Sequence, residues 1–391
     1  MDKWRAMLFD ALMQLPHLKS RRCLAAVLAI LAAAAAAPAA DLFVYFGTHS
    51  SGPGIGFSLA HFDTDTGALT PPQFLLEAVE PAYFVIAPDG RHLYTCNSGK
   101  AATVSAYATE PHTGRLTFLN RADTGGGDTS YLSLDQTGRY ALAANYDGGS
   151  IAVFELQPDG SFGARTAFVQ HTGKGVNPQR QSHAFAHSII TDPDNKFALA
   201  ADLGLDKLFV YRFDARDGSL QTNDPPFVSV QPGAGARHVK FHPNGKWVYL
   251  ITEMGSTIYA YNWDAARGAL AEFQTISTLP ADFHGSSACS ELLVHPNGKF
   301  LYGSNRGHDS LAVFAVDPAN GRLTPVQTIS SGGKTPRCFA IDPTGRWIVC
   351  ANHDSNNVVV FRIDETTGRL TQTGQPVSAP TPYCPRFLPV R

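Results

Sequence analysis

Four ionisable residues of the chain are candidates for catalysis: His187, Arg237, Glu253 and Arg306. A guanidinium group can stabilise the oxyanion that develops when a carbonyl is attacked, and a carboxylate or an imidazole can take a proton from water. A carboxylate among cations stays ionised, and a histidine exchanges its proton near neutral pH. These residue types predict acyl hydrolysis of a small acidic substrate, or proton transfer next to a carboxylate.

The candidates stand at fixed offsets from a repeated turn of the "HPNG", "DPDN" or "DPTG" type. His187, Arg237 and Arg337 lie six residues before the turn proline, and Glu253 and Arg306 lie ten residues after it. Several guanidiniums around one opening would bind an anion, because their planar fork matches carboxylate or phosphate oxygens. The candidate substrate-binding residues are Arg180, His183, His238, Glu291, Arg337, Arg386 and Asn145.

A structural interpretation competes with this one. Asn at the end of a strand caps the following turn with its own side chain, which explains Asn97, Asn305 and Asn352 without a ligand. Arg337 and Arg386 could pair with neighbouring repeats only. Buried structural ion pairs are the corresponding alternative for the four catalytic candidates.

The elements that position these residues follow from an internal repeat. A Gly followed by a small or basic residue and then Leu or Phe occurs seven times, 46 to 58 residues apart, from Gly67 to Gly368. The proline turns alternate with these glycine turns, and short alternating apolar runs such as "SIAVFEL" flank both. Alternation with a period of two predicts strands, and the turns predict hairpins. Four strands per repeat predict an all-β fold, a seven-bladed β-propeller of four-stranded antiparallel blades.

The two ends of the chain are predicted to share one blade. The first repeat begins at "LFVYFGTHSS" and lacks an inner hairpin, whereas the C-terminal "CPRFLPV" (384–390) matches the inner strand "TPRCFAI" (335–341). The C-terminal strand is therefore expected to complete the first blade and to close the ring, which removes the open sheet edges.

This topology predicts two different faces. One face carries the tight proline and glycine turns, so His242 and His295, which begin two of these turns, are expected at the surface. The other face carries the starts of the inner strands, the ends of the second strands and the longer connections. Function is expected there, at the mouth of the central channel.

Composition excludes some classes of function. Lys and Arg number 31 against 33 Asp and Glu, a net charge of −2, which does not support nucleic-acid binding. No Cys/His spacing typical of a metal site occurs, and we expect no cofactor and a monomer that binds a small anionic lactone or sugar acid. Cys338 and Cys350 flank a tight turn, so a disulfide between them is one possibility.

The N-terminal segment has the features of a signal peptide. Arg21 and Arg22 precede an apolar run over 24–37 and a Pro-Ala-Ala sequence at 38–40. The run is too short for a stable membrane span, and "SRRCL" resembles a twin-arginine signal. We therefore expect a signal peptide over residues 1–39, a single propeller domain over 40–391, and export to the periplasm or the medium.

Three long motifs resemble the seven-bladed β-propeller lactonase family, typified by the propeller type of 6-phosphogluconolactonase. They are "NPQRQSHAFAHSIITDPDNKFALAADLGLDKLFVY" (177–211), "GARHVKFHPNGKWVYLITE" (235–253) and "VHPNGKFLYGSNRGHDSLAVF" (294–314), and the resemblance covers essentially the whole predicted mature chain. The family includes a fungal carboxymuconate cycloisomerase, whose catalytic His, Arg, Glu and Arg correspond to His187, Arg237, Glu253 and Arg306.

The resemblance, together with the predicted mouth, implies roles for these residues. Glu253 would act as the base and Arg237 would stabilise the oxyanion. Arg306 would hold an anionic group of the substrate, and His187 would handle the leaving alcohol, although the residues alone leave the base open between His187 and Glu253. The implied activity is hydrolysis of a sugar-acid lactone.

The chain departs from the family pattern in two respects. The family usually has His-x-His before the third inner strand, but here Phe185 replaces the first His and His183 lies two positions earlier. An export signal is also unexpected, because sugar-phosphate lactones are made in the cytoplasm. The alternatives are a cycloisomerase-type enzyme that forms lactones, and a propeller that binds carbohydrate or protein without catalysis.

Overall fold

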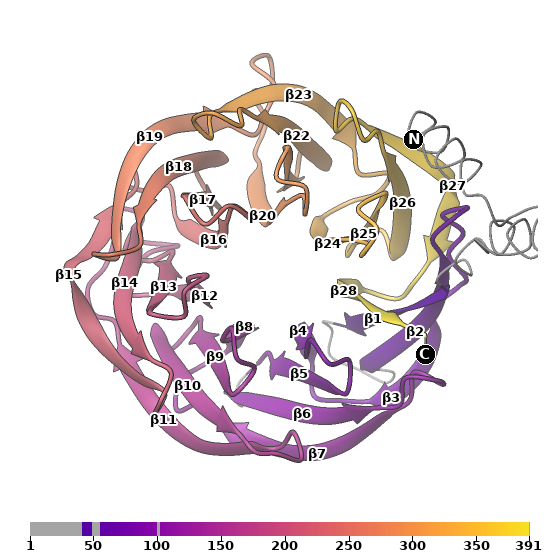
Figure 1. The fold of residues 1–391 in the computed structure, drawn as a ribbon. Helices are drawn as coiled ribbons and strands as arrows, with labels where there is room; N and C mark the ends of the chain where they lie inside the picture. The colour runs from indigo at the N-terminus through magenta and orange to yellow at the C-terminus, as the bar shows by residue number, and fades with distance from the viewer. Residues whose placement is uncertain (1–40, 49–54, 100–101, 391) are drawn as a thin grey trace, which may run out of the picture. The chain divides into compact units, whose positions relative to one another are not determined.

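The computed structural model describes residues 41–48, 55–99 and 102–390. Within these residues 28 strands form seven four-stranded antiparallel sheets, and Figure 1 shows them arranged around a central channel. The predicted seven-bladed β-propeller is therefore confirmed. No helix in the described part of the chain is long and apolar enough to cross a membrane. The predicted signal peptide, residues 1–39, lies outside the described residues.

In each sheet the strand nearest the channel is given first here. The first three sheets are β28 (Pro382–Pro389), β1 (Asp41–Thr48), β2 (Gly56–Asp63) and β3 (Gln73–Glu77); β4 (Pro81–Ile86), β5 (His92–Asn97), β6 (Thr103–Thr109) and β7 (Leu116–Asp123); and β8 (Thr129–Leu134), β9 (Tyr140–Asn145), β10 (Ser150–Leu156) and β11 (Phe162–Gln170). The next two are β12 (Ala186–Thr191), β13 (Phe197–Asp202), β14 (Lys207–Asp214) and β15 (Ser219–Ser229); and β16 (Ala236–Phe241), β17 (Trp247–Thr252), β18 (Thr257–Asp264) and β19 (Ala269–Ser277). The last two are β20 (Ala288–Val294), β21 (Phe300–Arg306), β22 (Ser310–Val316) and β23 (Leu323–Ser330); and β24 (Pro336–Ile341), β25 (Trp347–Asn352), β26 (Asn357–Ile363) and β27 (Leu370–Ser378).

The ring closes between the two ends of the chain, as predicted. β28 pairs antiparallel with β1, with Leu388 opposite Phe43 and Phe387 opposite Val44. Figure 1 shows the yellow β28 beside the indigo β1 on the channel side. The pairing satisfies the backbone groups of both strands and leaves neither as an open edge.

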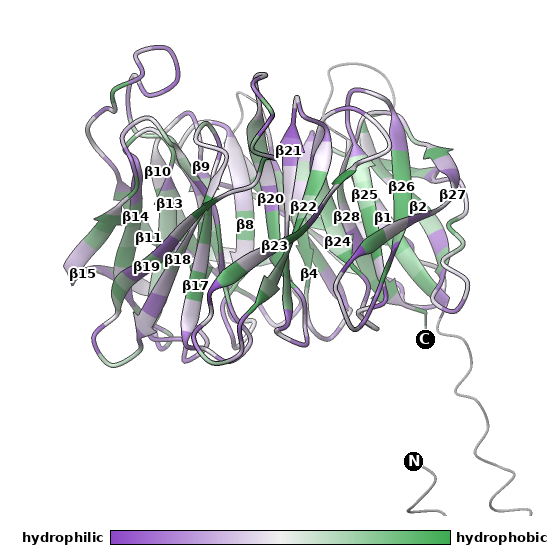
Figure 2. Ribbon diagram, turned by 90° about the horizontal axis from the view of Figure 1, so that it is seen from above, coloured by the Kyte–Doolittle hydropathy of each residue, from purple (hydrophilic) through white to green (hydrophobic). Residues whose placement is uncertain are grey.

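Burial differs from strand to strand within one blade. The second strands β9, β13, β17 and β25 are buried at every residue, because their two faces pack against the two neighbouring blades. Outer strands such as β11 are mostly part-buried or exposed. Figure 2 shows this distribution: hydrophobic residues line the strands through the body of the ring, and hydrophilic residues gather in the connections.

The glycine of each repeated turn is needed for two reasons. Gly67 has a φ of 74°, a left-handed conformation that other residues adopt at a cost. A Cβ atom at this position would also lie 2.3 Å from the Trp347 ring of the preceding blade. The Trp347 Nε1 atom donates to the Thr64 carbonyl at 2.8 Å, so the same turn joins the two blades by packing and by a hydrogen bond.

The prediction that His242 and His295 are surface residues is wrong. Both are buried, at 7% and 6% exposure. Each Nε2 atom donates to a glycine carbonyl in the turn of the next blade, His242 to Gly298 at 2.7 Å and His295 to Gly345 at 2.8 Å. The histidines therefore link neighbouring turns, and this link keeps their side chains buried on a face that was predicted to be exposed.

The disulfide considered between Cys338 and Cys350 is also not formed. Cys338 is paired across the strands with Ala351, and Cys350 is paired with Phe339, so the two thiols are out of register. All five cysteines of the described chain are buried free thiols.

The closing strand should carry a large share of the stability. Leu388 is 1% exposed in the core, so Leu388→Ala should lower the free energy of unfolding by about 3 kcal/mol through lost contacts and an unfilled cavity. Val390, 36% exposed just beyond β28, provides the control, and Val390→Ala should change stability by less than about 0.5 kcal/mol. Urea denaturation measures both variants. Equal stabilities would contradict closure by β28.

Candidate active site

A polar pocket of about 240 Å³ opens at the mouth of the channel. The face is the predicted one, because the pocket walls come from the starts of inner strands and the ends of second strands. The charged or aromatic groups in its walls are Asp128, Tyr146, Arg180, His187, Glu253, Arg306, Arg337 and Tyr383. They belong to different blades, and the ring brings them together.

Glu253, immediately after β17, is the electrostatic centre of the polar pocket. Its carboxylate accepts from Arg180 Nη2 at 2.5 Å, Arg237 Nε at 2.9 Å and Arg306 Nη2 at 3.0 Å. Burial disfavours ionisation of this group, but the charges of Arg306 and Arg237 outweigh burial and hold the Glu253 pKa well below its ordinary value. The carboxylate is therefore ionised and fully occupied by donors.

Arg237, on β16, lies behind Glu253 and outside the pocket walls. It is 2% exposed, and its Nη1 atom donates to the Ser290 carbonyl and contacts His238 Nε2 at 3.1 Å. A guanidinium can only donate, so Nε2 of His238 must be the acceptor and the proton must sit on Nδ1. That Nδ1 donates to Glu291 Oε1 at 2.9 Å.

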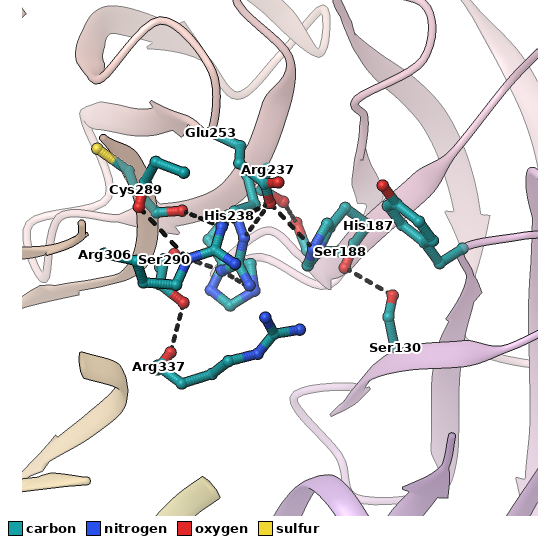
Figure 3. A network of polar contacts seen from close by, with 12 residues as sticks. Ser130, His187, Ser188, Arg237, His238, Glu253, Cys289, Ser290, Arg306 and Arg337 are labelled. Atoms are coloured by element: carbon teal, nitrogen blue, oxygen red, sulfur yellow. Dashed lines mark hydrogen bonds and ion pairs between the residues drawn. The ribbon is translucent and has the colours of Figure 1, made fainter. Parts of the chain in front are cut away.

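The chain of contacts Glu291–His238–Arg237–Glu253 requires a neutral His238, and its surroundings favour that state. Burial lowers the pKa of His238 to about 4. Burial also disfavours ionisation of Glu291, but the hydrogen bond from His238 Nδ1 and the charge of Lys240 outweigh burial and hold the Glu291 pKa below its ordinary value. Figure 3 shows His238 beside Arg237, on the side away from Glu253.

His187, on β12, is the neutral polar group of the pocket wall. Burial, together with the charge of Arg237, holds its pKa well below the ordinary value. Its Nε2 atom lies 3.9 Å from Glu253 Oε2, and its buried Nδ1 atom has no hydrogen-bond partner among the described residues. An uncharged imidazole beside an ionised carboxylate can accept a proton and have the resulting charge stabilised.

Besides Arg180, two arginines present guanidinium groups to the pocket, and their hydrogen bonding differs. Arg306 donates to Glu253 and to the Cys289 carbonyl at 2.9 Å, so one side of its fork is occupied. Arg337 donates from Nε to Tyr383 Oη at 2.6 Å and lies over that ring, 5.0 Å from its centroid. Within the described residues its two terminal nitrogens have no acceptor, and Figure 3 shows them pointing into the open space of the site.

Besides Arg237, five of the predicted site residues do not line the polar pocket: His183, His238, Glu291, Arg386 and Asn145. His238 and Glu291 lie behind Arg237. Asn145 is fully buried and bonds to Thr129 and Ser150, as the capping interpretation of the Asn positions expects. Arg386 lies deeper in the channel, over the ring of Tyr83.

The altered histidine motif forms an aromatic cluster beside the pocket. Phe185 is 9% exposed, and its ring lies 4.8 Å from the Tyr146 ring. His183 is exposed, stacks on Phe185 at 4.1 Å and has its Nε2 atom 2.9 Å from the Asp147 carbonyl oxygen. His183 therefore does not replace the missing histidine inside the pocket.

The sequence reasoning did not select Tyr146 and Tyr383, which line the pocket. Tyr146 occupies the same repeat position as Glu253 and Arg306, so the offset count could have found it, but no charge drew attention to it. Tyr383 precedes the recognised part of the C-terminal strand. Within the described chain no three His, Cys, Asp or Glu side chains gather as metal ligands.

The buried neutral His238 should make stability depend on pH. The folded protein does not protonate this residue until the pH nears 4, whereas the unfolded chain does so from about 6.5, so stability is lost as the pH falls between these values. Between pH 7 and pH 5 the loss due to His238 should be about 2 kcal/mol.

His238→Gln can still accept from Arg237 and donate to Glu291. It should therefore remove the loss of stability between pH 7 and pH 5 that is due to His238. The control is His112→Gln at an exposed turn, which should keep the decline of the wild type. Urea denaturation at the two pH values measures both. An unchanged decline in His238→Gln would refute a neutral buried His238.

Comparison with known proteins agrees with this architecture. The family model "Lactonase, 7-bladed beta-propeller" matches residues 43–387. The 6-phosphogluconolactonase of Bacillus subtilis is 36% identical over 345 residues, 88% of this chain and 97% of the relative. A 6-phosphogluconolactonase of Formosa agariphila is 31% identical over 302 residues, 74% of this chain and 83% of the relative. The solved structure of a periplasmic gluconolactonase of Pseudomonas aeruginosa superposes with a TM-score of 0.85 at 33% identity, covering 90% of this chain and 100% of that one. The chain therefore belongs to the seven-bladed β-propeller lactonase family.

Proposed function

We propose that the protein hydrolyses the lactone of a sugar acid in the polar pocket. The observation that carries the proposal is the meeting of a neutral imidazole, His187, with an ionised carboxylate, Glu253, and three guanidiniums in one small opening. The relatives named as 6-phosphogluconolactonases and as a gluconolactonase support this chemistry. At about 240 Å³ the pocket suits a single small ring rather than a polymer.

We assign the role of general base to His187. Glu253 is stabilised as an anion by three arginines, so it has little tendency to take a proton. His187 is uncharged at neutral pH, and its Nε2 atom lies 3.9 Å from Glu253 Oε2, beyond hydrogen-bond distance. In this mechanism His187 takes a proton from water as the oxygen of that water attacks the lactone carbonyl. Glu253, 3.9 Å away, stabilises the imidazolium that forms.

Arg306 is better placed than Arg237 to stabilise the oxyanion. The guanidinium of Arg237 is buried and engaged with Glu253 and Ser290, whereas Arg306 lines the pocket. When the tetrahedral intermediate collapses, the bond from the carbonyl carbon to the ring oxygen breaks. His187 then returns its proton to that oxygen, which leaves as an alcohol. Water has been added across the ester, and the product is the open sugar acid.

Arg337 would hold the part of the lactone that is remote from the ester. Its terminal nitrogens are free and its position is fixed by Tyr383. A planar pair of donors suits a phosphate, a carboxylate or two neighbouring hydroxyls. The same group would hold the negatively charged product until it is released.

The general base can be tested by substitution. His187→Asn should lower kcat by roughly 10²–10⁴ while the protein stays folded, because a positioned base contributes about that factor. The control is His171→Asn, since His171 is equally buried but bonds to Asp202 and Tyr211 outside the pocket. The assay follows the opening of gluconolactone, 6-phosphogluconolactone and a muconolactone, with the spontaneous rate subtracted.

Full activity of folded His187→Asn would mean that Glu253 is the base. In that case Glu253→Gln should show the large decrease in kcat. Activity confined to the muconolactone would instead favour chemistry of the cycloisomerase type.

We also propose that residues 1–39 are a signal peptide and that the enzyme works outside the cytoplasm. The charged start, apolar run and small residues of this segment support it, as does the similarity to a periplasmic gluconolactonase. An exported enzyme would meet lactones that are not phosphorylated.

N-terminal sequencing of protein from the native host should find Ala40 or Asp41 as the first residue, in the periplasmic or secreted fraction. Cleavage is expected there because Ala37 and Ala39 supply the two small residues before the cut. A mature protein that begins at Met1 or Met13 would contradict export by this segment.

A further inference from the structure

A second cavity, of about 550 Å³, opens at the opposite end of the channel, on the face of the tight turns. We call it the turn-face cavity, and it shares no lining residue with the polar pocket. Its walls are the last residues of the inner strands, which are largely apolar. They include Ile86, Leu134, Ile190, Val294 and Ile341.

The two cavities are separated by aromatic side chains. Tyr83 and Tyr131 stack with their ring centroids 4.3 Å apart, and the edge of the His238 ring packs against both, at 5.8 and 5.0 Å. All three residues are buried. A molecule in the turn-face cavity is therefore not at the catalytic residues.

Two cations face the turn-face cavity without an ion-pair partner of their own. Lys240 Nζ donates to Tyr131 Oη at 2.9 Å. Arg386 Nη1 donates to the Pro385 carbonyl at 2.7 Å and contacts Cys338 Sγ at 3.8 Å. Within the described residues neither cation has a carboxylate within ion-pair distance, although both line the cavity.

The carboxylates near these cations are already engaged. Glu291 is bonded to His238 at 2.9 Å and accepts from Cys338 Sγ at 3.2 Å. Asp135, in the cavity wall, accepts from the Tyr140 backbone at 2.8 Å in its own turn and from Asn195 Nδ2 at 2.8 Å in the turn of the next blade. The charge of Glu291 acts on both Lys240 and Arg386, so one carboxylate serves two cations at a distance. A sheltered positive charge without a direct partner is costly, and an anion from solution would relieve that cost.

We propose that the turn-face cavity binds a small carboxylate with an apolar tail. The carboxylate would lie between Lys240 and Arg386, where a guanidinium and an ammonium both offer donors. The tail would lie along the aliphatic strand ends, which a sugar or an inorganic phosphate would leave uncovered. A cavity of about 550 Å³ between inner strands suits a small molecule rather than a protein segment.

Calorimetric titration of the mature protein with octanoate and with octan-1-ol tests the proposal. Wild type should bind octanoate at least tenfold more tightly than the alcohol, which has the same tail and no charge. Lys240→Met should weaken octanoate binding at least tenfold. Lys246→Met, at an exposed turn of the same face, should leave it unchanged. Arg337→Met should also leave it unchanged, because Arg337 belongs to the polar pocket.

Several results would overturn the proposal. Equal affinity for octanoate and octan-1-ol would mean an apolar cavity without an anion site. Equal affinity of wild type and Lys240→Met, or loss of binding in Arg337→Met, would put the carboxylate elsewhere. An absence of octanoate binding at about 5 mM would refute the proposal. If Lys240→Met does not fold, the comparison of the acid with the alcohol on wild type and on Arg337→Met still decides. These outcomes do not depend on lactone hydrolysis.

Discussion

The antiparallel pairing of β28 with β1 is the constraint on which the rest of the described structure depends. It holds the sheet of β28, β1, β2 and β3 between its two neighbours, so the inner strands stay around one channel. Residues more than a hundred positions apart, such as Arg180 and Arg306, can then meet one carboxylate at hydrogen-bond distance. An open ring would leave these charges on separate blades in water, where each would be solvated by itself.

The surroundings inside the closed ring fix the charge states of the site. A histidine exposed to water is partly charged near neutrality, but His187 and His238 are buried among guanidiniums and both are neutral. Glu253 is equally buried and is nevertheless ionised, because three arginines surround it. The division of labour in the proposed mechanism follows from this difference: the residue with the free lone pair handles the proton, and the ionised carboxylate stabilises the charge.

The channel is divided by Tyr83, Tyr131 and His238 into two chambers of different chemistry. The chamber at the mouth is small and polar, and the one at the turn face is larger and mainly aliphatic with two cations. Both are built from the same inner strands, which begin in the first and end in the second. His238 belongs to the partition and also bonds to Arg237, so the two chambers meet at a residue that orients the catalytic charges.

The sequence by itself determined the blade number, the closure by the C-terminal strand and the face that carries the site. All three follow from periodicity, because a repeated turn and a matching strand leave few ways to bury the apolar faces. It could not determine which way a side chain turns at a given repeat position. Arg237 and Arg337 stand at the same offset from their turns. Arg237 is nevertheless bonded to Glu253 and Ser290 behind the pocket, whereas Arg337 bonds to Tyr383 through Nε and its terminal nitrogens have no acceptor among the described residues. The same limit explains why His242 and His295 were wrongly predicted at the surface, since their hydrogen-bond partners lie in the next blade. Neighbours across blades are set by the closing of the ring, and only the tertiary structure decides which donor meets which acceptor there.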